Sequence, residues 1–373
     1  MTRRHFVCRL AAACVVLFVA GAGHVAAATE LRVVEVARGL AHPWSIVFLP
    51  DGEALVSERN GGLRMIQAGK LLPDALKGVP AAYAEVDGGL LGLALDPDFE
   101  DAPFVYLCLS RGTDAANAST VVRGRLEGAA LVDLVTIFEA RPLKAKASHF
   151  GCRLLFAADG TLYVTLGDGY DYRDEAQSLD DHFGKVVRLN GDGSIPVDNP
   201  FVGRSGALPD IYSYGHRNVQ GIARRPGTGE IWIHEHGPRG GDEVNVLAPG
   251  ANYGWPKTTY GIDYSGELIT ELTEAPGITP PVVYWVPSIA PSGMAFYDGD
   301  VFPDWRGDLF VGALAGKHLR RIDVDANGRI IGEHPLLESL GERIRDVAVG
   351  PDGLLYVLTD SADGRVLKLE PAL

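Results

Sequence analysis

The chain has 373 residues, of which 46% are hydrophobic and 22% charged, and its formal net charge is −14 at pH 7. An acidic surface of this kind repels nucleic acids and anionic lipids, which excludes functions that depend on binding either. The length suits two ordinary domains or one large all-β unit.

The first segment has the pattern of an export signal. Arg3 and Arg4 precede an apolar run that is followed by small residues ending at Ala28. We therefore predict a signal peptide over residues 1–28, because the run is too short for a membrane anchor. The arginine pair favours the twin-arginine route, and a Sec signal is the alternative. Either route predicts a periplasmic or secreted protein.

One phrase recurs six times along the chain: a turn rich in Pro, Asp and Gly, followed by a short apolar strand. The strands begin at Ala54, Phe104, Leu162, Ile231, Leu309 and Leu355. Glycine provides the positive φ that such turns need, and the strands are rich in β-branched and aromatic residues. Repetition at this spacing predicts a radial repeat, an all-β six-bladed β-propeller.

The remaining sequence fits one ring. A β-sandwich would place turns about every 8–12 residues, closer together than these. No long stretch after the signal shows helical periodicity. We expect Leu31–Val36 to complete the last blade, so that residues 29–373 form a single propeller domain. The Gly- and Asp-rich insertions between the second and fifth turns predict long loops on one face, over the central channel.

Two cysteines, Cys108 and Cys152, remain after the signal is removed. An oxidising compartment permits a disulfide between them. Two buried free thiols inside strands fit the sequence equally well, and no spacing typical of a zinc site occurs.

A histidine and an aspartate stand out in the middle of the chain. His149 directly precedes a blade strand, which places it at the rim, and imidazole is the usual proton acceptor for an alcohol near neutral pH. The strand that follows is expected to end at Asp168, one strand length away. If the two side chains meet, the carboxylate orients the base and stabilises its protonated form. Alternatively, His149 is structural and Asp168 caps a turn.

The glycine-rich segment 211–256 is typical of a site built on loops. Arg217 and Asn218 place a planar cation beside an amide, which suits the oxygens of a quinone, carboxylate or phosphate. The backbone carbonyls of Gly237 and Pro238 are candidate ligands for a hard cation such as Ca²⁺.

A pair of arginines lies near the end of the chain. Arg343 and Arg345 alternate along a predicted strand, so both face one side and are suited to bind carboxylates bidentately. The alternative in so acidic a protein is ion pairing at the surface.

From about Gly39 to the C-terminus the chain resembles the soluble quinoprotein glucose/sorbosone dehydrogenases, the aldose sugar dehydrogenases that depend on pyrroloquinoline quinone (PQQ). Several motifs in the same order carry this resemblance: Gly89-Leu90-Leu91-Gly92, His149 with Gly151 and Arg153, Gly167-Asp168, Gly184 to Asn190, Gly215 to Gly221, Asn252 to Pro256, and Arg343-x-Arg345-Asp346.

The resemblance implies a six-bladed propeller with PQQ across the channel mouth. In that family the histidine that matches His149 takes the proton of the anomeric hydroxyl while a hydride passes from C1 to the quinone. The aspartate that matches Asp168 supports it, and the arginine that matches Arg217 holds the reducible carbonyl. The other implied contacts are Asn218 and Ser288 to PQQ, Arg343 and Arg345 near its carboxylates, and the carbonyls of Gly237 and Pro238 to calcium.

Three positions depart from the family pattern. The glucose enzymes carry glutamine and aspartate where this chain aligns Asp87 and Ser148, so the resemblance does not imply glucose specificity. A lysine that contacts the cofactor aligns near Ala315, with Lys317 two residues on. Loss of a charge-assisted hydrogen bond weakens binding by about 1.5–3 kcal/mol. The chain also lacks a long insertion between residues 260 and 284, which implies a more open sugar site.

These observations predict a PQQ- and calcium-dependent dehydrogenase that oxidises C1 of aldoses or related aldehydes and passes electrons to an external acceptor. Two alternatives stay open. A calcium-dependent lactonase would need several acidic ligands converging on the channel, and the sequence offers few. A non-catalytic periplasmic binding propeller that has lost PQQ would explain Asp87 and the missing lysine, but leaves His149, Arg217 and the arginine pair without a role.

Overall fold

Each of the six repeated phrases forms the first turn and the second strand of one antiparallel sheet. The structure, a computed structural model, describes residues 30–372, and the predicted signal peptide lies outside this range. The described residues form six four-stranded sheets. They also contain three short 3₁₀ helices: η1 (Arg173–Gln177), η2 (Pro303–Trp305) and η3 (Glu338–Leu340).

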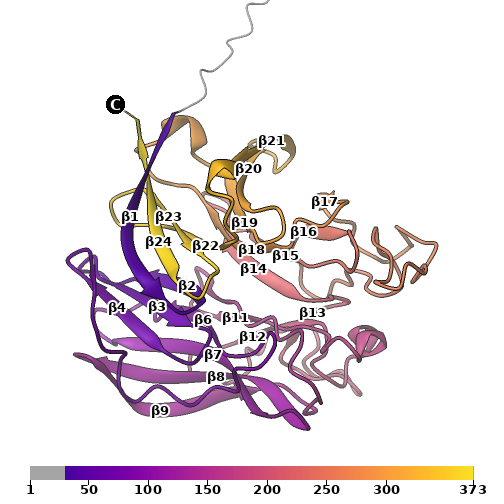
Figure 1. The fold of residues 1–373 in the computed structure, drawn as a ribbon. Coiled ribbons are helices and arrows are strands. Elements are labelled where there is room, and N and C mark those ends of the chain that lie inside the picture. The colour runs from indigo at the N-terminus through magenta and orange to yellow at the C-terminus, as the bar shows by residue number, and fades with distance from the viewer. Residues whose placement is uncertain (1–29, 373) are drawn as a thin grey trace, which may run out of the picture.

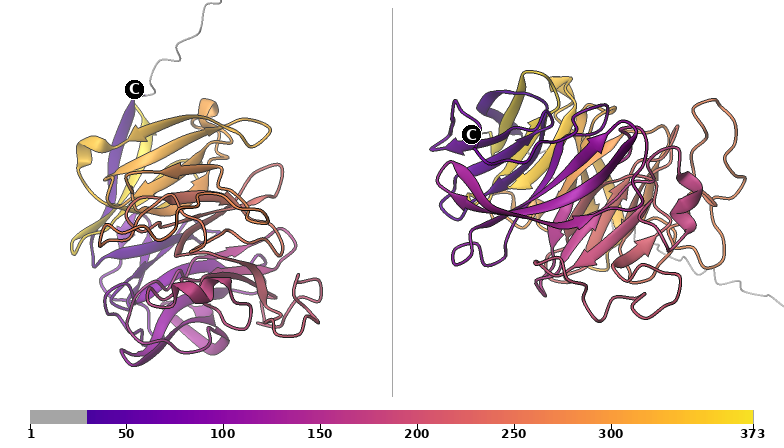
Figure 2. Two further views of the ribbon diagram at one scale, coloured as in Figure 1. Left: turned by 90° about the vertical axis from the view of Figure 1, so that its right-hand side faces the viewer. Right: turned by 90° about the horizontal axis from the view of Figure 1, so that it is seen from below.

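The sheets are the blades of a propeller, numbered here 1–6 in chain order (Figures 1 and 2). Blades 1–3 are β2 (Pro43–Phe48), β3 (Ala54–Glu58), β4 (Leu63–Gln67) and β5 (Lys70–Leu71); β6 (Leu90–Leu95), β7 (Phe104–Thr113), β8 (Ala116–Glu127) and β9 (Ala130–Glu139); and β10 (Leu154–Phe156), β11 (Leu162–Thr165), β12 (Lys185–Leu189) and β13 (Ile211–Tyr214). Blades 4–6 are β14 (Val219–Arg224), β15 (Ile231–Glu235), β16 (Asp242–Val246) and β17 (Val283–Trp285); β18 (Pro291–Phe296), β19 (Leu309–Ala313), β20 (His318–Val324) and β21 (Ile330–Leu336); and β22 (Ile344–Val349), β23 (Leu355–Thr359) and β24 (Gly364–Pro371) with β1 (Leu31–Leu40).

The first strand of the chain closes the ring. β1 pairs antiparallel with β24, with Leu31 opposite Pro371 and Val33 opposite Leu369. In Figure 1 the two strands run side by side in indigo and yellow. The pairing predicted for Leu31–Val36 is present, and β1 continues to Leu40. Because closure leaves no blade incomplete, the all-β six-bladed β-propeller predicted from the turns is confirmed.

The second strand is deeply buried in most blades. Every residue of β3, β11, β15 and β19 is buried. Neighbouring blades cover both faces of such a strand, so it has no side that faces water, and its sequence is a nearly continuous apolar run. This is why the repeated phrase is visible in the sequence.

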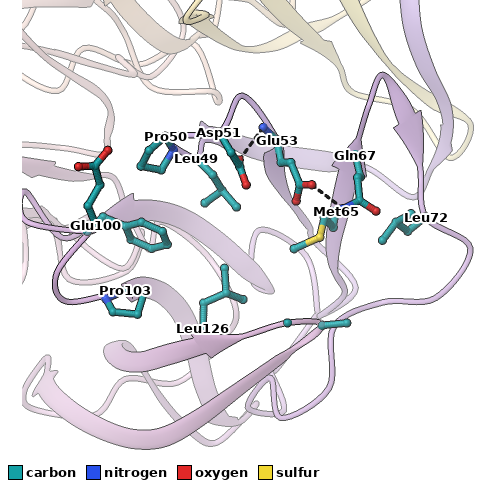
Figure 3. A pocket seen from close by; sticks show the side chains of 13 residues that line it. Leu49, Pro50, Asp51, Glu53, Met65, Gln67, Leu72, Glu100, Pro103 and Leu126 are labelled. Carbon is teal, nitrogen blue, oxygen red and sulfur yellow. Dashed lines mark hydrogen bonds between the residues drawn. The ribbon is translucent and has the colours of Figure 1, made fainter.

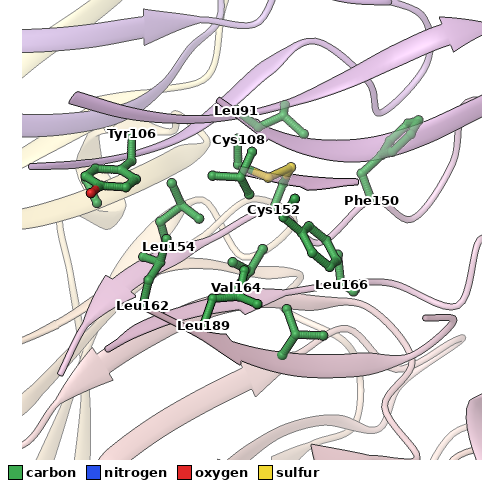
Figure 4. Close-up of a cluster of buried hydrophobic side chains, with 14 of the residues drawn as sticks. Leu91, Tyr106, Cys108, Phe150, Cys152, Leu154, Leu162, Val164, Leu166 and Leu189 are labelled. Carbon is green, nitrogen blue, oxygen red and sulfur yellow. A yellow bond between two sulfur atoms is a disulfide. The ribbon is translucent and has the colours of Figure 1, made fainter. Parts of the chain in front are cut away.

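Blades 2 and 3 share a hydrophobic core that contains a disulfide (Figure 4). Cys108 in β7 is bonded to Cys152, which lies just before β10, and their Cα atoms are 5.4 Å apart. The structure thus selects the disulfide from the two alternatives, and Cys152 is outside a strand. The bond ties the segment that carries His149 to the neighbouring blade.

Removing this disulfide is expected to destabilise the protein. The bond spans 44 residues, and a loop of that length corresponds to about 4 kcal/mol in the chain-entropy description. The free energy of unfolding of Cys108→Ala/Cys152→Ala, measured in urea, should fall by roughly that amount. Reduced wild-type protein is the matched control, since it keeps both sulfur atoms in the core. Identical midpoints for oxidised and reduced wild-type protein would contradict the prediction.

A buried arginine holds the centre of the ring. Arg153 donates to Asp346 Oδ1 (2.7 Å), to the carbonyl of Gln220 (2.9 Å) and to the carbonyl of Arg345 (3.1 Å). Its guanidinium also lies 3.9 Å from the ring centroid of Trp44. These partners belong to blades 1, 4 and 6, so one side chain of blade 3 connects strands around the channel.

Two long connections extend from one side of the molecule. One joins β11 to β12 and contains η1, and the other joins β16 to β17 (right in Figure 1, facing the viewer in the left panel of Figure 2). They supply the long loops that the sequence predicted between the second and fifth turns. Within residues 30–372 no helix is long and apolar enough to cross a membrane.

Candidate functional site

His149 is held in an unusual backbone conformation at the start of blade 3. Its φ is +51°, in the left-handed region that side chains other than glycine rarely adopt. Its carbonyl packs against Gly167, where a Cβ atom would lie only 2.2 Å from the oxygen. Only glycine permits this contact. Strained residues of this kind persist where the surrounding structure fixes them, often at functional sites.

The predicted histidine–aspartate pair forms. His149 Nδ1 lies 2.6 Å from Asp168 Oδ1. The sequence predicted a single strand between the two residues. That prediction was wrong, because β10 and β11 both lie between them. An antiparallel hairpin returns the chain to the end where it started, and so the pair meets.

Asp168 is an ionised carboxylate, and both of its oxygens take part in hydrogen bonds. It is 1% exposed, and its Oδ2 accepts a hydrogen bond from Trp255 Nε1 (2.8 Å). Burial by itself raises the pKa of Asp168, but the hydrogen bond from His149 and the nearby charge of Arg217 hold that pKa below its usual value. An ionised carboxylate only accepts, so Nδ1 of His149 carries the proton and Nε2 is free to take one.

Arg217 lies beside this pair on the same face. Its Nη1 donates to the carbonyls of His236 (3.1 Å) and Gly237 (2.7 Å). Its guanidinium carbon is 5.4 Å from the ring of Trp255 and 5.9 Å from the ring of Tyr264. The arginine is 4% exposed, so it is a nearly dehydrated cation that faces the cavity described below.

A series of buried hydrogen bonds holds the backbone of Arg217 in place. The backbone N–H of Arg217 donates to Glu235, whose other oxygen lies 2.9 Å from His216 Nδ1. His216 Nε2 in turn is 2.8 Å from Ser213 Oγ. The sequence interpretation missed Glu235 and Ser213, because a buried support resembles any other polar residue in a strand. The Glu235-His236 pair beside glycines was the only available signal.

Asn218 lies next to the pair through its backbone and its side chain. Its Oδ1 accepts from the backbone N–H of Gly151 (3.1 Å) and from Gln220 Nε2 (3.2 Å). Its backbone bridges to Gly167. The side chain thus fastens β14 to the loop that carries His149.

The two arginines near the end of the chain share one carboxylate, but only Arg345 lies in a strand, because β22 begins at Ile344 and Arg343 precedes it. Arg343 Nη2 and Arg345 Nη2 lie 3.0 and 2.8 Å from Asp360 Oδ2. Burial opposes ionisation of Asp360, but Arg345, His42 and Arg343 hold its pKa well below the usual value. Both arginines therefore form ion pairs, as the alternative interpretation of the sequence predicted. Two guanidinium groups on one carboxylate still leave surplus positive charge.

The proposed metal ligands lie on the loop after β15. The carbonyl of Gly237 accepts from Arg217, and its N–H donates to Asp242 Oδ1 (2.9 Å). Ser288 Oγ donates to the other oxygen of Asp242 (2.7 Å), so Ser288 and Gly237 are positioned by the same residue. Within residues 30–372 no group of three or more His, Cys, Asp or Glu side chains could hold a metal ion.

The positions that depart from the family pattern also lie near the site or on the same face. Asp87 Oδ2 accepts from the backbone N–H of His149 (3.3 Å). Ala315 and Lys317 are exposed in the loop between β19 and β20, which lies at the same end of the strands as the loops after β11 and β15.

Two cavities differ sharply in chemistry. One of about 610 Å³ lies between blades 1 and 2 and is lined by Leu49, Met65, Leu126 and other residues of β4, β8 and the turns after β2 and β8 (Figure 3). Those turns are at the opposite strand ends from His149. The second, of about 360 Å³, is lined by Asp168, Arg217, Pro238 and Trp255. The second combines the Arg217 cation with the carboxylate that pairs with His149, so it marks the candidate active site.

Comparisons with known proteins identify the family of the chain. The family described as Glucose / Sorbosone dehydrogenase matches residues 40–368. Aldose sugar dehydrogenase YliI of Escherichia coli is 46% identical over 89% of this chain and 91% of its own length. Quinoprotein glucose dehydrogenase B of Acinetobacter calcoaceticus is 29% identical over 88% and 85% of the two chains. The PQQ-bound structure of aldose sugar dehydrogenase from Streptomyces coelicolor superposes with a TM-score of 0.76 at 30% identity, covering 92% of this chain and 99% of that one. The chain therefore belongs to the glucose/sorbosone dehydrogenase family.

Proposed function

We propose that this protein is a PQQ- and calcium-dependent dehydrogenase that oxidises aldoses, or related aldehydes, at C1. The observation that carries the proposal is the placement of His149, Asp168 and Arg217 on one face beside a cavity of about 360 Å³. Two relatives are named as quinoprotein and aldose sugar dehydrogenases, and one similar structure contains PQQ. The predicted export signal supports a periplasmic or secreted enzyme, and an external acceptor would take up the electrons.

The residues present fit the cofactor. PQQ is a carboxylated quinone, and the surplus positive charge of Arg343 and Arg345 suits carboxylates. Arg345 Nε is buried with no hydrogen-bond partner among residues 30–372, so the guanidinium has unused donor capacity. At the other end, Arg217 and Asn218 would contact the quinone oxygens. When bound, PQQ supplies the hydride acceptor and a calcium ion polarises it.

The carbonyls of Gly237 and Pro238 would hold that calcium. Hard cations accept backbone oxygens, and a metal bound in this way needs no cluster of acidic side chains. In the structure Arg217 donates to the Gly237 carbonyl, and a carbonyl oxygen has a second lone pair that remains for the metal. The missing acidic cluster within residues 30–372 gives no support to the calcium-dependent lactonase.

The protein's own residues perform the proton chemistry. His149 Nε2 takes the proton of the C1 hydroxyl as the C1 hydride leaves, so the sugar loses two electrons and two protons in all and becomes a lactone. Asp168 stabilises the imidazolium that forms and keeps the ring in the reactive tautomer. Arg217 places a fixed, poorly hydrated positive charge where negative charge develops, which costs no reorganisation during the reaction.

The test is a spectroscopic titration of the purified protein with PQQ and Ca²⁺, followed by an aldose. We expect stoichiometric binding and reduction of the quinone by the sugar, and loss of both when EDTA is present. Absence of binding at micromolar PQQ would overturn the proposal and favour the non-catalytic binding propeller. If the wild-type protein binds PQQ weakly, the variant Ala315→Lys tests whether the missing lysine is the cause. Tighter binding by this variant would attribute the weakness to the missing cation.

A further inference from the structure

A buried lysine lies near the proposed base and has no part in the proton chemistry described above. Lys144 is 5% exposed, which is rare for a lysine because removing an ammonium group from water is costly. Its Nζ donates to the backbone carbonyl of Lys146 (2.7 Å). The same atom lies 3.9 Å from the ring centroid of Phe150, the residue after His149. The ammonium group is therefore held against the segment that carries the base.

Contacts with two blades fix the position of Lys144. Its backbone exchanges two hydrogen bonds with Asn117 in β8: the N–H of Lys144 donates to the Asn117 carbonyl (2.9 Å), and the N–H of Asn117 donates to the Lys144 carbonyl (2.8 Å). The side chain reaches the loop after β11 in blade 3. A Cβ atom at Gly169 would lie 2.7 Å from Lys144 Cδ, so the lysine stem packs directly on the residue that follows Asp168.

The charge of Lys144 acts on the carboxylates that contact His149. Burial lowers the pKa of Lys144 to about 8. Three nearby carboxylates oppose this effect and favour the charged form of the lysine: Asp87, Asp168 and Asp171. Two of them contact His149, because Asp168 binds its ring and Asp87 accepts from its backbone N–H. At pH 7 Lys144 is thus a cation in a poorly hydrated place, where charges act strongly on one another.

The groups around the His149 ring have opposing effects on its proton. Asp168 is 2.6 Å from Nδ1, and the Tyr170 ring packs edge-on with centroids 5.1 Å apart. The other titratable or charged groups near the ring are Asp87, Lys144, Arg217 and His236. The two carboxylates favour a protonated imidazole, and the cations of Lys144 and Arg217 oppose it.

We propose that Lys144 is a positioning residue whose buried charge offsets Asp87 and Asp168, so that His149 is unprotonated and able to act as a base at neutral pH. This inference rests on the proposed function. A base beside two carboxylates holds its proton to higher pH when an opposing cation is removed. Arg217 is the other cation, but it faces the cavity and would contact the cofactor, whereas Lys144 is enclosed by protein.

Histidine NMR measures this coupling without any turnover. The ring signal of His149, in protein that contains isotope-labelled histidine and no PQQ, is identified by its absence in His149→Ala. In Lys144→Met and Lys144→Gln we expect the titration midpoint of this signal to move about one pH unit higher than in the wild-type protein. Lys144→Arg, which keeps the charge, should restore the wild-type midpoint. Lys146→Met is the matched control, since it removes an exposed lysine that pairs with Asp171.

The pH dependence of kcat/KM for glucose, in protein supplied with PQQ and Ca²⁺, tests the consequence for catalysis. The acidic limb of Lys144→Met should move to higher pH by the same amount as the NMR midpoint. The two profiles should converge above pH 8, because the wild-type lysine also loses its charge there.

The outcomes separate this inference from the proposed function. An unmoved midpoint in both uncharged variants, an equal shift in Lys144→Arg, or an unmoved acidic limb would overturn it. A shifted midpoint in a protein that oxidises no aldose would uphold the coupling between Lys144 and His149 and reject the proposed function.

Discussion

Replacing His149 with alanine is expected to lower kcat for aldose oxidation by about 10²–10⁴-fold, the usual contribution of a general base. PQQ binding should stay close to that of the wild-type protein, because the residues proposed to hold the cofactor belong to other blades. Stopped-flow reduction of bound PQQ by sugar measures the first effect, and spectroscopic titration measures the second. Near-wild-type turnover would show that His149 is not the base.

Two further variants make this result specific. Asp168→Asn keeps the shape of the pair, but an amide can donate to Nδ1 and so fix the unreactive tautomer; kcat should fall steeply here too. His334→Ala removes another histidine paired with an aspartate, since His334 Nε2 lies 2.9 Å from Asp323 on blade 5. That pair is far more exposed than His149–Asp168. Its loss should leave both kcat and PQQ binding unchanged.

Replacing Arg153 with methionine is expected to reduce the free energy of unfolding by about 3–5 kcal/mol. The substitution leaves Asp346 buried, 5% exposed, without its cationic partner. Burial already raises the pKa of Asp346 above its usual value, and Arg153 is a main influence that lowers it. The same change removes the contact with Trp44. Urea unfolding followed by fluorescence measures the loss.

The control and the double variant identify the cause. Arg125 pairs with Glu127 and Asp133 at the surface of blade 2, and Arg125→Met should cost no more than about 1 kcal/mol. Adding Asp346→Leu to Arg153→Met removes the stranded charge, so part of the lost stability should return. If Arg153→Met costs no more than Arg125→Met, the central ion pair does not hold the ring together.

Most of the fold was predictable from local sequence. Each Pro-, Asp- and Gly-rich turn specifies its own backbone conformation, and the apolar run after it can only be a strand buried on both faces. Six such units, separated by about the length of one propeller blade, are compatible with few architectures. The pairing of β1 with β24 followed from the same reasoning, because a ring needs its last blade completed. Motifs with a fixed order also carried the family resemblance.

The site was predictable as a list of residues but less so as an arrangement. His149, Asp168, Arg217 and the arginine pair were found because their residue types suit the chemistry. The sequence did not show that two strands separate His149 from Asp168. It also did not show that Asp360 joins Arg343 to Arg345, since the shared carboxylate lies in a different hairpin loop of the same blade.

The sequence by itself determined the blades, their number and the family, because turn chemistry and burial patterns act over a few neighbouring residues. Only the tertiary structure decided the Cys108–Cys152 bond, the central contacts of Arg153 and the burial of Lys144 beside the loop of Asp168. Each of these joins segments that are far apart in the chain. Their distances are set by how the blades pack around the channel, and no local pattern records that packing.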